Sequence, residues 1–589
     1  MKLLQLLFIL CIWSCELLAQ AYSIRTFNWK DAGYKSNAPI PTLSLNIMNY
    51  GGNNTNSTAN NVAFTAALTA LNGSTGVIYF PKGIYNFTAA LSINRDSITL
   101  AGAGYDSTQL RFNMNGAINN CININGTQVN TDTSSFSSPG LIDSNWVQVL
   151  NSSPFQIGDW VHLTTTDNAI MFSSWAYGSL GQIMQIKNIA GNTISFHSPF
   201  RYSYGLALKP KIRKIIPRKE IIINCLKIVR EESTASQTSL ISFDKAVNCK
   251  VHGVEGDSTN FAHIELNKCC HVEISNCWFH HAHAYGGNGQ GYGITFQYST
   301  SECKAENNIF NHLRHSILFQ AGANGNVCGY NYSFDPYWTQ GIFPTNSAGD
   351  IVMHGNFPFA NLCEGNINQH TVLDNSHANS GPYNTFFRNR SELYGLFMNN
   401  SPATDSAQFL GLEVTGTGGF LGQYVLAGNG HVQHANMVQG VLTPTNPAPL
   451  TENSLYLMGN ERPLCFTPGL HNWPVIGQPN PYNSGSNAAR DRYSLGRMAS
   501  CACTNLITRL EDEFKKQAEF HLYPNPAKDI LHIKCDHKIE TFRVYNAEGK
   551  LLLNSTYLSE INLSAWPKGL YLLHAAGKNF SHTQKFWIN

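Results

Sequence analysis

Charged side chains are scarce in this sequence. Asp, Glu, Lys and Arg make up 13% of the 589 residues, about half the share typical of soluble domains. The formal net charge is +2, so no excess of charge points to nucleic acid, and we expect none as a partner. Gly, Asn, Ser and Thr take the missing places, a composition typical of a turn-rich, all-β protein.

Long apolar runs are also missing beyond the N-terminus. Lys2 precedes an apolar stretch, Leu3 to Trp13, that is too short to cross a bilayer. A small-residue cleavage motif follows at Ala19-Gln20-Ala21. We interpret residues 1–21 as a signal peptide, and we expect an exported mature protein without a membrane span.

A repeat marked by recurring cysteine and asparagine begins near residue 222. Spacings of 21 to 35 residues separate Cys225, Cys249, Cys270, Cys303, Cys328 and Cys363. Periods of this size predict a solenoid whose coils stack equivalent side chains. We expect these cysteines to form an inward ladder of buried thiols rather than disulfides, and Cys501 and Cys503 to be the more reactive pair. A matching series predicts an asparagine ladder in the turns: Asn276, Asn307, Asn331, Asn366 and Asn389.

The region 46–110 adds a specific pattern. NIMNYGGNNTNSTANN leads into an apolar-periodic helix that includes Phe64 and Leu68, followed by VIYFPKGIYNF and LAGAG. This resembles the N-terminal part of the pectate lyase superfamily over about 65 residues. The resemblance implies a right-handed parallel β-helix with an N-terminal capping helix, and it does not specify one reaction. Where that family has an acidic DDT, this chain has NSTANN.

The other boundaries follow from changes in pattern. Alternating segments and a Gly-Asn turn predict a small antiparallel β insertion at about 145–204. We expect the β-helix to span 22–480, and a linker with a short helix to span 481–518.

The last seventy residues, 519–589, predict a small β-sandwich. YPNP at 523–526, VYNAEGK at 544–550 and LSAWPKGLYLL at 563–573 resemble the type A C-terminal sorting domain of the type IX secretion system of Bacteroidetes. The resemblance implies that this machinery is a partner and that the protein is exported, either released or held on the outer cell surface.

Polar residues gather in loops on consecutive coils, where a β-helix usually holds its substrate. We expect the catalytic residues to come from His315, Asp350, His354, Glu364, Asp374, His377 and Arg388. We expect substrate contacts from His281, His283, Tyr285, Tyr292, Arg314, Tyr383 and Arg390. The stretch HHAHAYGGNGQGYG lacks a neighbouring cysteine or carboxylate pattern, so it favours a cleft wall over a metal site.

Two reactions fit this inventory. Hydrolysis of a glycosidic bond needs two carboxyl groups, which Asp350, Glu364 and Asp374 could supply. β-Elimination on an acidic polysaccharide needs a base such as histidine, a cation such as Arg388, and a proton donor such as Tyr383. Histidine and arginine outnumber carboxylates in these loops, which favours a lyase. The sequence lacks the motifs of polygalacturonases. It also lacks the aspartate cluster of calcium-dependent pectate lyases, so calcium is only a candidate cofactor.

We therefore predict an exported, monomeric enzyme that degrades a polysaccharide. The alternative from another class is a non-catalytic carbohydrate-binding or adhesion protein on the cell surface.

Overall fold

The computed structural model describes residues 23–35, 41, 43–339, 349–399, 404–445, 450–477, 485–501, 521–534, 540–547, 549–556, 559–577 and 580–589. The chain divides into two compact units, residues 1–501 and 502–589. The expected signal peptide, the greater part of the expected linker with its helix, and Cys503 lie outside the described residues. None of the helices in the described ranges is both long and apolar enough to span a membrane.

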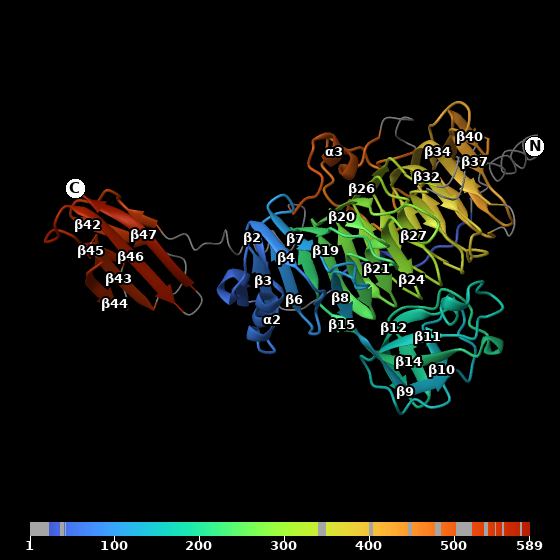
Figure 1. The fold of residues 1–589 in the computed structure, drawn as a ribbon, viewed down its shortest axis with the longest axis horizontal. Helices are drawn as coiled ribbons and strands as arrows, with labels where there is room; N and C mark the ends of the chain where they lie inside the picture. Colours follow the sequence, from blue (N-terminus) through green and yellow to red (C-terminus); the bar gives the residue numbers. More distant parts are fainter. Residues whose placement is uncertain are drawn as a thin grey trace, which may run out of the picture. The chain divides into compact units, whose positions relative to one another are not determined.

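The first unit is a right-handed parallel β-helix, as predicted (Figure 1). Among the described residues, its short strands stack into three parallel ladders, here called sheets 1, 2 and 3. Sheet 1 contains β1 (Leu43–Asn46), β3 (Gly76–Phe80), β6 (Ile98–Gly102), β15 (Arg218–Lys219), β16 (Ile222–Asn224), β19 (Ala246–His252), β22 (Cys270–Ser275), β25 (Lys304–Glu306), β28 (Val327–Gly329), β31 (Leu362–Glu364), β33 (Thr385–Phe387), β35 (Gln408–Leu410) and β38 (Val432–His434).

Sheets 2 and 3 share two long, bent strands, β32 (Ile367–Leu373) and β34 (Arg390–Met398). Sheet 2 also contains β2 (Thr55–Ala59), β4 (Gly83–Phe87), β7 (Thr108–Phe112), β17 (Lys227–Arg230), β20 (Glu255–Thr259), β23 (Trp278–Ala282), β26 (Ile309–Asn311), β29 (Tyr332–Phe334), β36 (Glu413–Val414) and β39 (Asn436–Val438). The hairpin strand β40 (Val441–Thr443) ends this sheet and is antiparallel to β39. Sheet 3 also contains β5 (Leu91–Ser92), β8 (Ile122–Asn125), β18 (Ile241–Asp244), β21 (Ala262–Asn267), β24 (Tyr292–Gln297), β27 (His315–Phe319), β30 (Ile351–Met353) and β37 (Gln423–Val425).

The core lies between the three sheets and is built from stacked identical positions. In sheet 3, Ile264 pairs with Ile294 and Ile294 with Ile317, and all are buried. The rings of Phe296 and Phe319 stack with centroids 4.8 Å apart. Because alternate residues of each strand point inward, the residues between them point outward and form columns on the surface.

Helices close or cover parts of this core. Helix α2 (Asn61–Ala70) buries Phe64 and Leu68 against the first coil, although Val62 is 81% exposed. Helix α3 (Ala488–Ser494) and the segment 450–477 pack against sheet 1 and neighbouring turns. The 3₁₀ helices are η1 (Trp29–Asp31), η2 (Ile47–Tyr50), η3 (Ser174–Ala176) and η4 (Leu206–Leu208).

The insertion is larger than the sequence predicted and forms an antiparallel sheet of its own. Its strands are β9 (Thr127–Ser135), β10 (Trp146–Gln148), β11 (Trp160–Thr164), β12 (Gln182–Ala190), β13 (Thr193–Phe196) and β14 (Lys211–Ile216). Its two ends adjoin, because a side chain added at Gly126 would collide with the backbone of Ile216 and Pro217.

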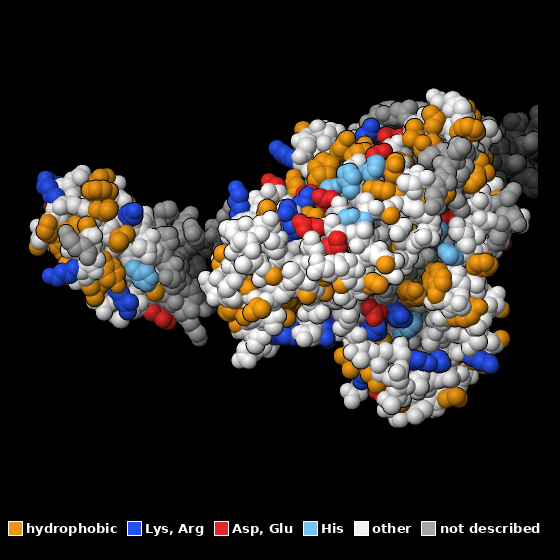
Figure 2. Space-filling view, in the orientation of Figure 1, with side chains coloured by type: hydrophobic (Ala, Val, Ile, Leu, Met, Phe, Trp, Pro, Cys, Tyr) orange, Lys and Arg blue, Asp and Glu red, His pale blue; other side chains and the backbone are white. Residues whose placement is uncertain are grey.

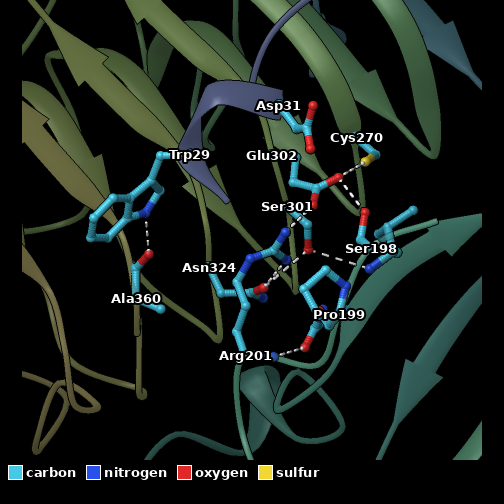
Figure 3. A network of polar contacts seen from close by, with 12 residues as sticks. Trp29, Asp31, Ser198, Pro199, Arg201, Cys270, Ser301, Glu302, Asn324 and Ala360 are labelled. Carbon is cyan, nitrogen blue, oxygen red and sulfur yellow. Dashed lines mark hydrogen bonds and ion pairs between the residues drawn. The ribbon is translucent and has the colours of Figure 1, made fainter. Parts of the chain in front are cut away.

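A buried polar network anchors the insertion to the β-helix (Figure 3). The guanidinium of Arg201 forms an ion pair with Glu302 and donates to Oδ1 of Asn324 at 3.1 Å. Ser198 donates to the other oxygen of Glu302 at 2.8 Å. Because both oxygens of Glu302 are engaged, the buried group Cys270, His271 and Glu302 has a structural explanation.

The two predicted ladders are present in altered form. Asn308, Asn331, Asn366 and Asn389 form a continuous amide ladder, with spacings of 2.8 to 3.0 Å. Asn307 bonds Asn276 beside it. A further ladder, missed from the sequence, joins Asn326, Asn361 and Asn384 at the turns that lead from sheet 3 to sheet 1.

The cysteines do not form one column. Cys249, Cys303, Cys328 and Cys363 are buried thiols in the core, and only Cys328 and Cys363 pair directly among these described positions. Cys270 is also a buried thiol but packs against the insertion. The prediction was wrong for Cys225, which forms a disulfide with Cys501, whose Cα lies 5.6 Å away.

The second unit is a β-sandwich, as predicted. One sheet contains β41 (His521–Tyr523), β42 (Ile530–Lys534) and β45 (Glu560–Asn562), and the other contains β43 (Thr541–Asn546), β44 (Leu551–Ser555), β46 (Gly569–Gly577) and β47 (Phe580–Ile588). Leu531, Val544 and Phe586 belong to the core between the sheets.

Candidate active site

A cleft of about 560 Å³ lies over the outer face of sheet 3. Its floor includes Gln297, the last residue of β24, and Gln320, which directly follows β27 and donates from Nε2 to Oε1 of Gln297 at 2.6 Å. One wall is the glycine-rich loop 283–291, and the opposite side includes Trp175 of η3, from the insertion. The insertion lies beside β21 and β24 in Figure 1. A cleft of this size suits a ligand of a few sugar rings.

A histidine–aspartate pair lies at one end of this cleft. His354 and Asp374 follow Met353 and Leu373, which are paired in register, so the two outward residues adjoin. Nδ1 of His354 donates to Oδ2 of Asp374, and the backbone N–H of Ser376 donates to Oδ1 at 2.9 Å. Both side chains are buried. This bond fixes the tautomer of His354 and leaves the Nε2 lone pair as a potential base.

A row of rings continues from this pair along the cleft. The centroid of His354 lies 5.6 Å from that of His315 and 5.1 Å from that of His377. Tyr292 lies 5.0 Å beyond His315, and Trp175 lies 5.4 Å beyond His377. Burial lowers the pKa of His377 to about 4, and burial together with the charge of Arg314 lowers that of His315 well below its usual value. Both imidazoles are therefore neutral at pH 7.

Arg314 brings a cation to the wall formed by the glycine-rich loop. Its Nη1 donates to the carbonyl oxygen of Gly286 at 2.7 Å and lies 3.4 Å from the hydroxyl of Tyr292. The guanidinium lies over the rings of Tyr292 and Trp338, 5.7 Å from each centroid. Burial raises the pKa of Tyr292, so its hydroxyl keeps its proton at neutral pH.

The cleft adjoins a second, basic hollow of about 500 Å³ on the insertion side. Trp175 and Tyr298 line both. The second hollow adds Lys211, Arg213 and Lys268, whose ammonium lies 5.0 Å over the ring of Tyr298. The two hollows together offer aromatic rings beside a row of cations, an arrangement suited to a chain of anionic sugars.

Six of the residues that the sequence singled out thus come together at this cleft: Tyr292, Arg314, His315, His354, Asp374 and His377.

Three others lie at or just after the end of β23 in sheet 2: His281 belongs to the strand, and His283 and Tyr285 belong to the first part of the glycine-rich loop. His281 and Tyr285 surround His312, with ring centroids 5.1 and 5.2 Å from it. Nε2 of His283 lies 3.0 Å from the carbonyl oxygen of Arg230.

Asp350 and Tyr383 lie in turns and do not line the cleft. The carboxylate of Asp350 is buried and accepts from the hydroxyl of Ser333 and from the backbone N–H groups of Gln369 and His370. Burial raises its pKa to about 6. Tyr383 lies in a turn with a φ of +67°, and its ring contacts that of Phe27. These contacts explain both residues structurally.

Glu364, Arg388 and Arg390 lie on or beside sheet 1, beneath the segments that cover it. Glu364 accepts from the hydroxyl of Tyr330 at 2.9 Å and from the N–H of Leu455 at 2.8 Å, and burial raises its pKa to about 7. Arg388 donates to the carbonyl oxygens of residues 452 and 476. Arg390 pairs with buried Glu413 at 2.7 Å. All three are remote from the cleft lining.

Two family models match separate parts of the chain. One, described as rhamnogalacturonase A/epimerase, pectate lyase-like, matches residues 44–158. The other, described as a secretion system C-terminal sorting domain, matches residues 521–589. Residues 44–158 are pectate lyase-like, and residues 521–589 are a secretion sorting domain. Both resemblances seen in the sequence are confirmed, and the sorting domain indicates export by type IX secretion.

Solved structures of similar fold are distant in sequence. The tailspike of Acinetobacter baumannii bacteriophage AP22, solved with an A. baumannii capsular saccharide, has 14% identity and a TM-score of 0.46 over 66% of this chain and 69% of its own. The tailspike of Pseudomonas phage LKA1 has 16% identity and a TM-score of 0.47, over 63% of this chain and 64% of its own. The A-module of an Azotobacter vinelandii mannuronan C-5 epimerase has 13% identity and a TM-score of 0.36, over 67% and 77%. No curated protein matches the chain.

The pectate lyase-like segment ends before the coils that carry the cleft and supplies none of its lining residues. Sequence reasoning missed Trp175, Glu265, Gln297 and Gln320 there. The outward parity of β21 and β24 could have pointed to Glu265 and Gln297, but nothing in the sequence placed Trp175 of the insertion over sheet 3. Glu265 is the carboxylate that lines the cleft in the described part of the chain, so no aspartate cluster for calcium is found there.

Proposed function

We propose that the protein is an exported enzyme that acts on an acidic polysaccharide in the cleft over sheet 3, as a β-eliminating lyase. The observation that carries this proposal is the buried His354–Asp374 pair, which presents Nε2 of His354 to the same cleft that Arg314 lines. A base beside a cation is what proton abstraction next to a sugar carboxylate requires.

The reaction follows from these positions. Nε2 of His354 takes the proton from the carbon that bears the carboxylate, and Asp374 stabilises the resulting imidazolium. Arg314 neutralises the sugar carboxylate, which makes that proton more acidic. The electron pair forms a C=C bond and expels the oxygen of the glycosidic bond, which takes a proton from the hydroxyl of Tyr292.

The lining of the cleft supports an anionic sugar chain as the substrate. Trp175 and Tyr298 offer ring faces or edges to sugar rings, and Lys211, Arg213 and Lys268 extend the positive surface beyond the reacting sugar. A hydrolase would need two carboxyl groups near the scissile bond. Asp374 would have to act with Glu265, which already accepts from Ser239 and Gln297, so the alternative fits less well.

We further propose that a signal peptide at residues 1–21 starts export and that the sorting domain completes it, leaving a monomeric enzyme outside the cell. The family description of residues 44–158 includes epimerases, which share the first step of proton abstraction. Elimination and epimerisation therefore differ only after that step, when the glycosidic oxygen either leaves or stays.

The experiment compares the mature protein with His354→Gln on a panel of acidic and neutral polysaccharides. We expect the ultraviolet absorbance of an unsaturated uronate to rise together with new reducing ends, on acidic substrates only. His354→Gln should lower kcat by about 10² to 10⁴-fold, whereas the exposed control His197→Gln should not. Reducing ends without absorbance would show a hydrolase. Solvent deuterium at the sugar carbon without cleavage would show an epimerase. Binding without any of these products would support the adhesion alternative.

A further inference from the structure

A second polar cluster lies on the outer face of sheet 2, at the end of β23, away from the cleft lining. The potential ligand atoms of Asp257, His280 and His281 all lie within 4.8 Å of one another. Figure 2 shows histidine side chains gathered beside acidic and basic ones over the region where Figure 1 labels β20 and β26. The proposed mechanism uses none of these residues.

The spacing of the atoms suits a small metal ion. Nδ1 of His280 lies 2.8 Å from Nδ1 of His281 and 3.7 Å from Oδ1 of Asp257. In a tetrahedral zinc site, ligands about 2.0–2.2 Å from the metal lie roughly 3.3–3.6 Å from one another. The two observed spacings fall on either side of that range, so small rotations of these side chains would complete the geometry.

The surroundings of His280 already resemble the support of a metal ligand. Its Nε2 lies 3.1 Å from Oε1 of Glu255, so Nε2–H is the donor and the Nδ1 lone pair faces His281 and Asp257. Its ring stacks on Trp278 with centroids 3.9 Å apart, which fixes the ring plane. Carboxylate–histidine–metal arrangements hold metal-binding imidazoles in this way.

Lys227 balances the negative charge without occupying the site. Its ammonium lies 2.9 Å from Oδ2 of Asp257 and 2.6 Å from Oε1 of Glu255. Oδ1 of Asp257, which accepts from the hydroxyl of Ser258, is the oxygen that faces His280.

We propose that Asp257, His280 and His281 bind one divalent transition-metal ion of the zinc class. Imidazole and carboxylate ligands suit such ions, and three protein ligands leave a fourth position for water or for His312, whose ring lies 5.1 Å from His281. The glycine-rich loop leaves the sheet directly after β23, so the ion fixes the foot of one wall of the cleft. The competing explanation is a simple hydrogen bond between the two imidazoles.

The experiment titrates the untagged mature protein, first stripped with a chelator, with Co²⁺ and then with Zn²⁺. We expect one equivalent of Co²⁺ to give visible absorption bands and Zn²⁺ to displace it. His281→Ala and Asp257→Asn should weaken binding at least 100-fold. Glu255→Gln, which removes the carboxylate that supports His280 and pairs with Lys227, should weaken it about 10- to 100-fold. His197→Ala, an exposed histidine of the insertion, should change nothing.

The proposal is overturned if the wild type binds no stoichiometric metal, or if His281→Ala binds as tightly as the wild type. His281 is exposed, so its replacement is not expected to unfold the chain, and a thermal melt of each variant verifies this. The readout uses no polysaccharide, and His354→Gln should bind Co²⁺ normally. Failure here is therefore distinct from failure of the proposed enzymatic function.

Discussion

The cleft over sheet 3 and the covered region at sheet 1 contain the same kinds of charged side chain, but these side chains face an open volume in the first and a covering segment in the second. In the cleft, Arg314 and His354 line an open volume of about 560 Å³. Beneath the covering segments, Glu364 of sheet 1 and Arg390, the first residue of β34, have polar atoms that bond Glu413, Tyr330 and Leu455. The two regions contain similar residue types, and they differ in whether another segment of the chain packs over those residues.

This difference shows how a solenoid assigns roles to repeated positions. The coils present outward residues on the three sheets, and each part of this surface is either covered by another segment or left open. On a covered side, the charged groups pair with groups of the covering segment or of the neighbouring coils, and these pairs help to hold the segments together. An open side keeps hydrogen-bonding capacity for a ligand. Substitutions in the two regions should therefore have separable effects on stability and on activity.

The largest expected effects come from a matched pair of arginines. Arg390→Ala leaves Glu413 buried without its partner, so we expect the free energy of unfolding to fall by about 3–5 kcal/mol with kcat of the folded protein unchanged. Arg314→Ala should do the reverse, lowering kcat on an acidic substrate about 10²- to 10³-fold while costing about 1 kcal/mol of stability. Urea unfolding and initial rates on the same preparations measure both.

A control sharpens this comparison. Replacing the whole buried pair, with Arg390→Met and Glu413→Leu together, should recover most of the stability that Arg390→Ala loses. Equal losses of rate for Arg314→Ala and Arg390→Ala would contradict the assignment of separate roles.

The next effect concerns pH. Burial raises the pKa of Glu364 from its ordinary 4.5 to about 7, so the folded state holds this proton more tightly than the unfolded state does. Its contribution to stability is complete below pH 4.5 and is lost as the pH rises to about 7. The shift corresponds to about 3 kcal/mol. Glu364→Gln should remove that part of the pH dependence, as measured by urea unfolding at pH 4.5 and 7.5, and an unchanged slope would refute this account.

The smallest effect concerns the wall that the insertion supplies. Trp175 is 42% exposed and lies edge-on to His377. Trp175→Ala should raise KM about 5- to 10-fold through the loss of a stacking surface worth about 1–1.5 kcal/mol, with little change in kcat. Phe172 lies in the same loop, and its exposed ring does not line the cleft. The KM of Phe172→Ala should therefore stay at the wild-type value. Similar changes in both variants would mean that the loop as a whole, rather than its tryptophan, binds the sugar.

The fold was predictable because local rules repeat along the chain. The period of cysteines and asparagines, the capping segment and the tail each specify their structure within a few dozen residues. The site was less predictable. Whether a side chain points outward depends on its place in the alternation of a strand, and a short turn between two strands can shift that alternation by one residue. Asp350 directly precedes β30 and Asp374 directly follows β32, and in the fold the first accepts from backbone N–H groups whereas the second orients His354.

Residues contributed by other coils were beyond the reach of sequence reasoning. The stretch that contains His280 and His281 lacks a nearby carboxylate along the chain, which is why it favoured a cleft wall. In the fold, Asp257 and Glu255 come from β20, the strand paired directly with β23. The register between neighbouring coils brings these carboxylates beside the histidines, and the spacing of residues along the sequence does not determine that register.

The adjoining ends of the insertion have an evolutionary consequence. Since residues 126 and 217 meet, and β8 and β16 continue the β-helix on either side, the segment between them behaves as a cassette. Such a cassette can be exchanged or lost without changing the register of the coils. It carries Trp175, Lys211 and Arg213, so a single recombination event would replace this part of the lining of the two hollows and leave His354 and Asp374 in place.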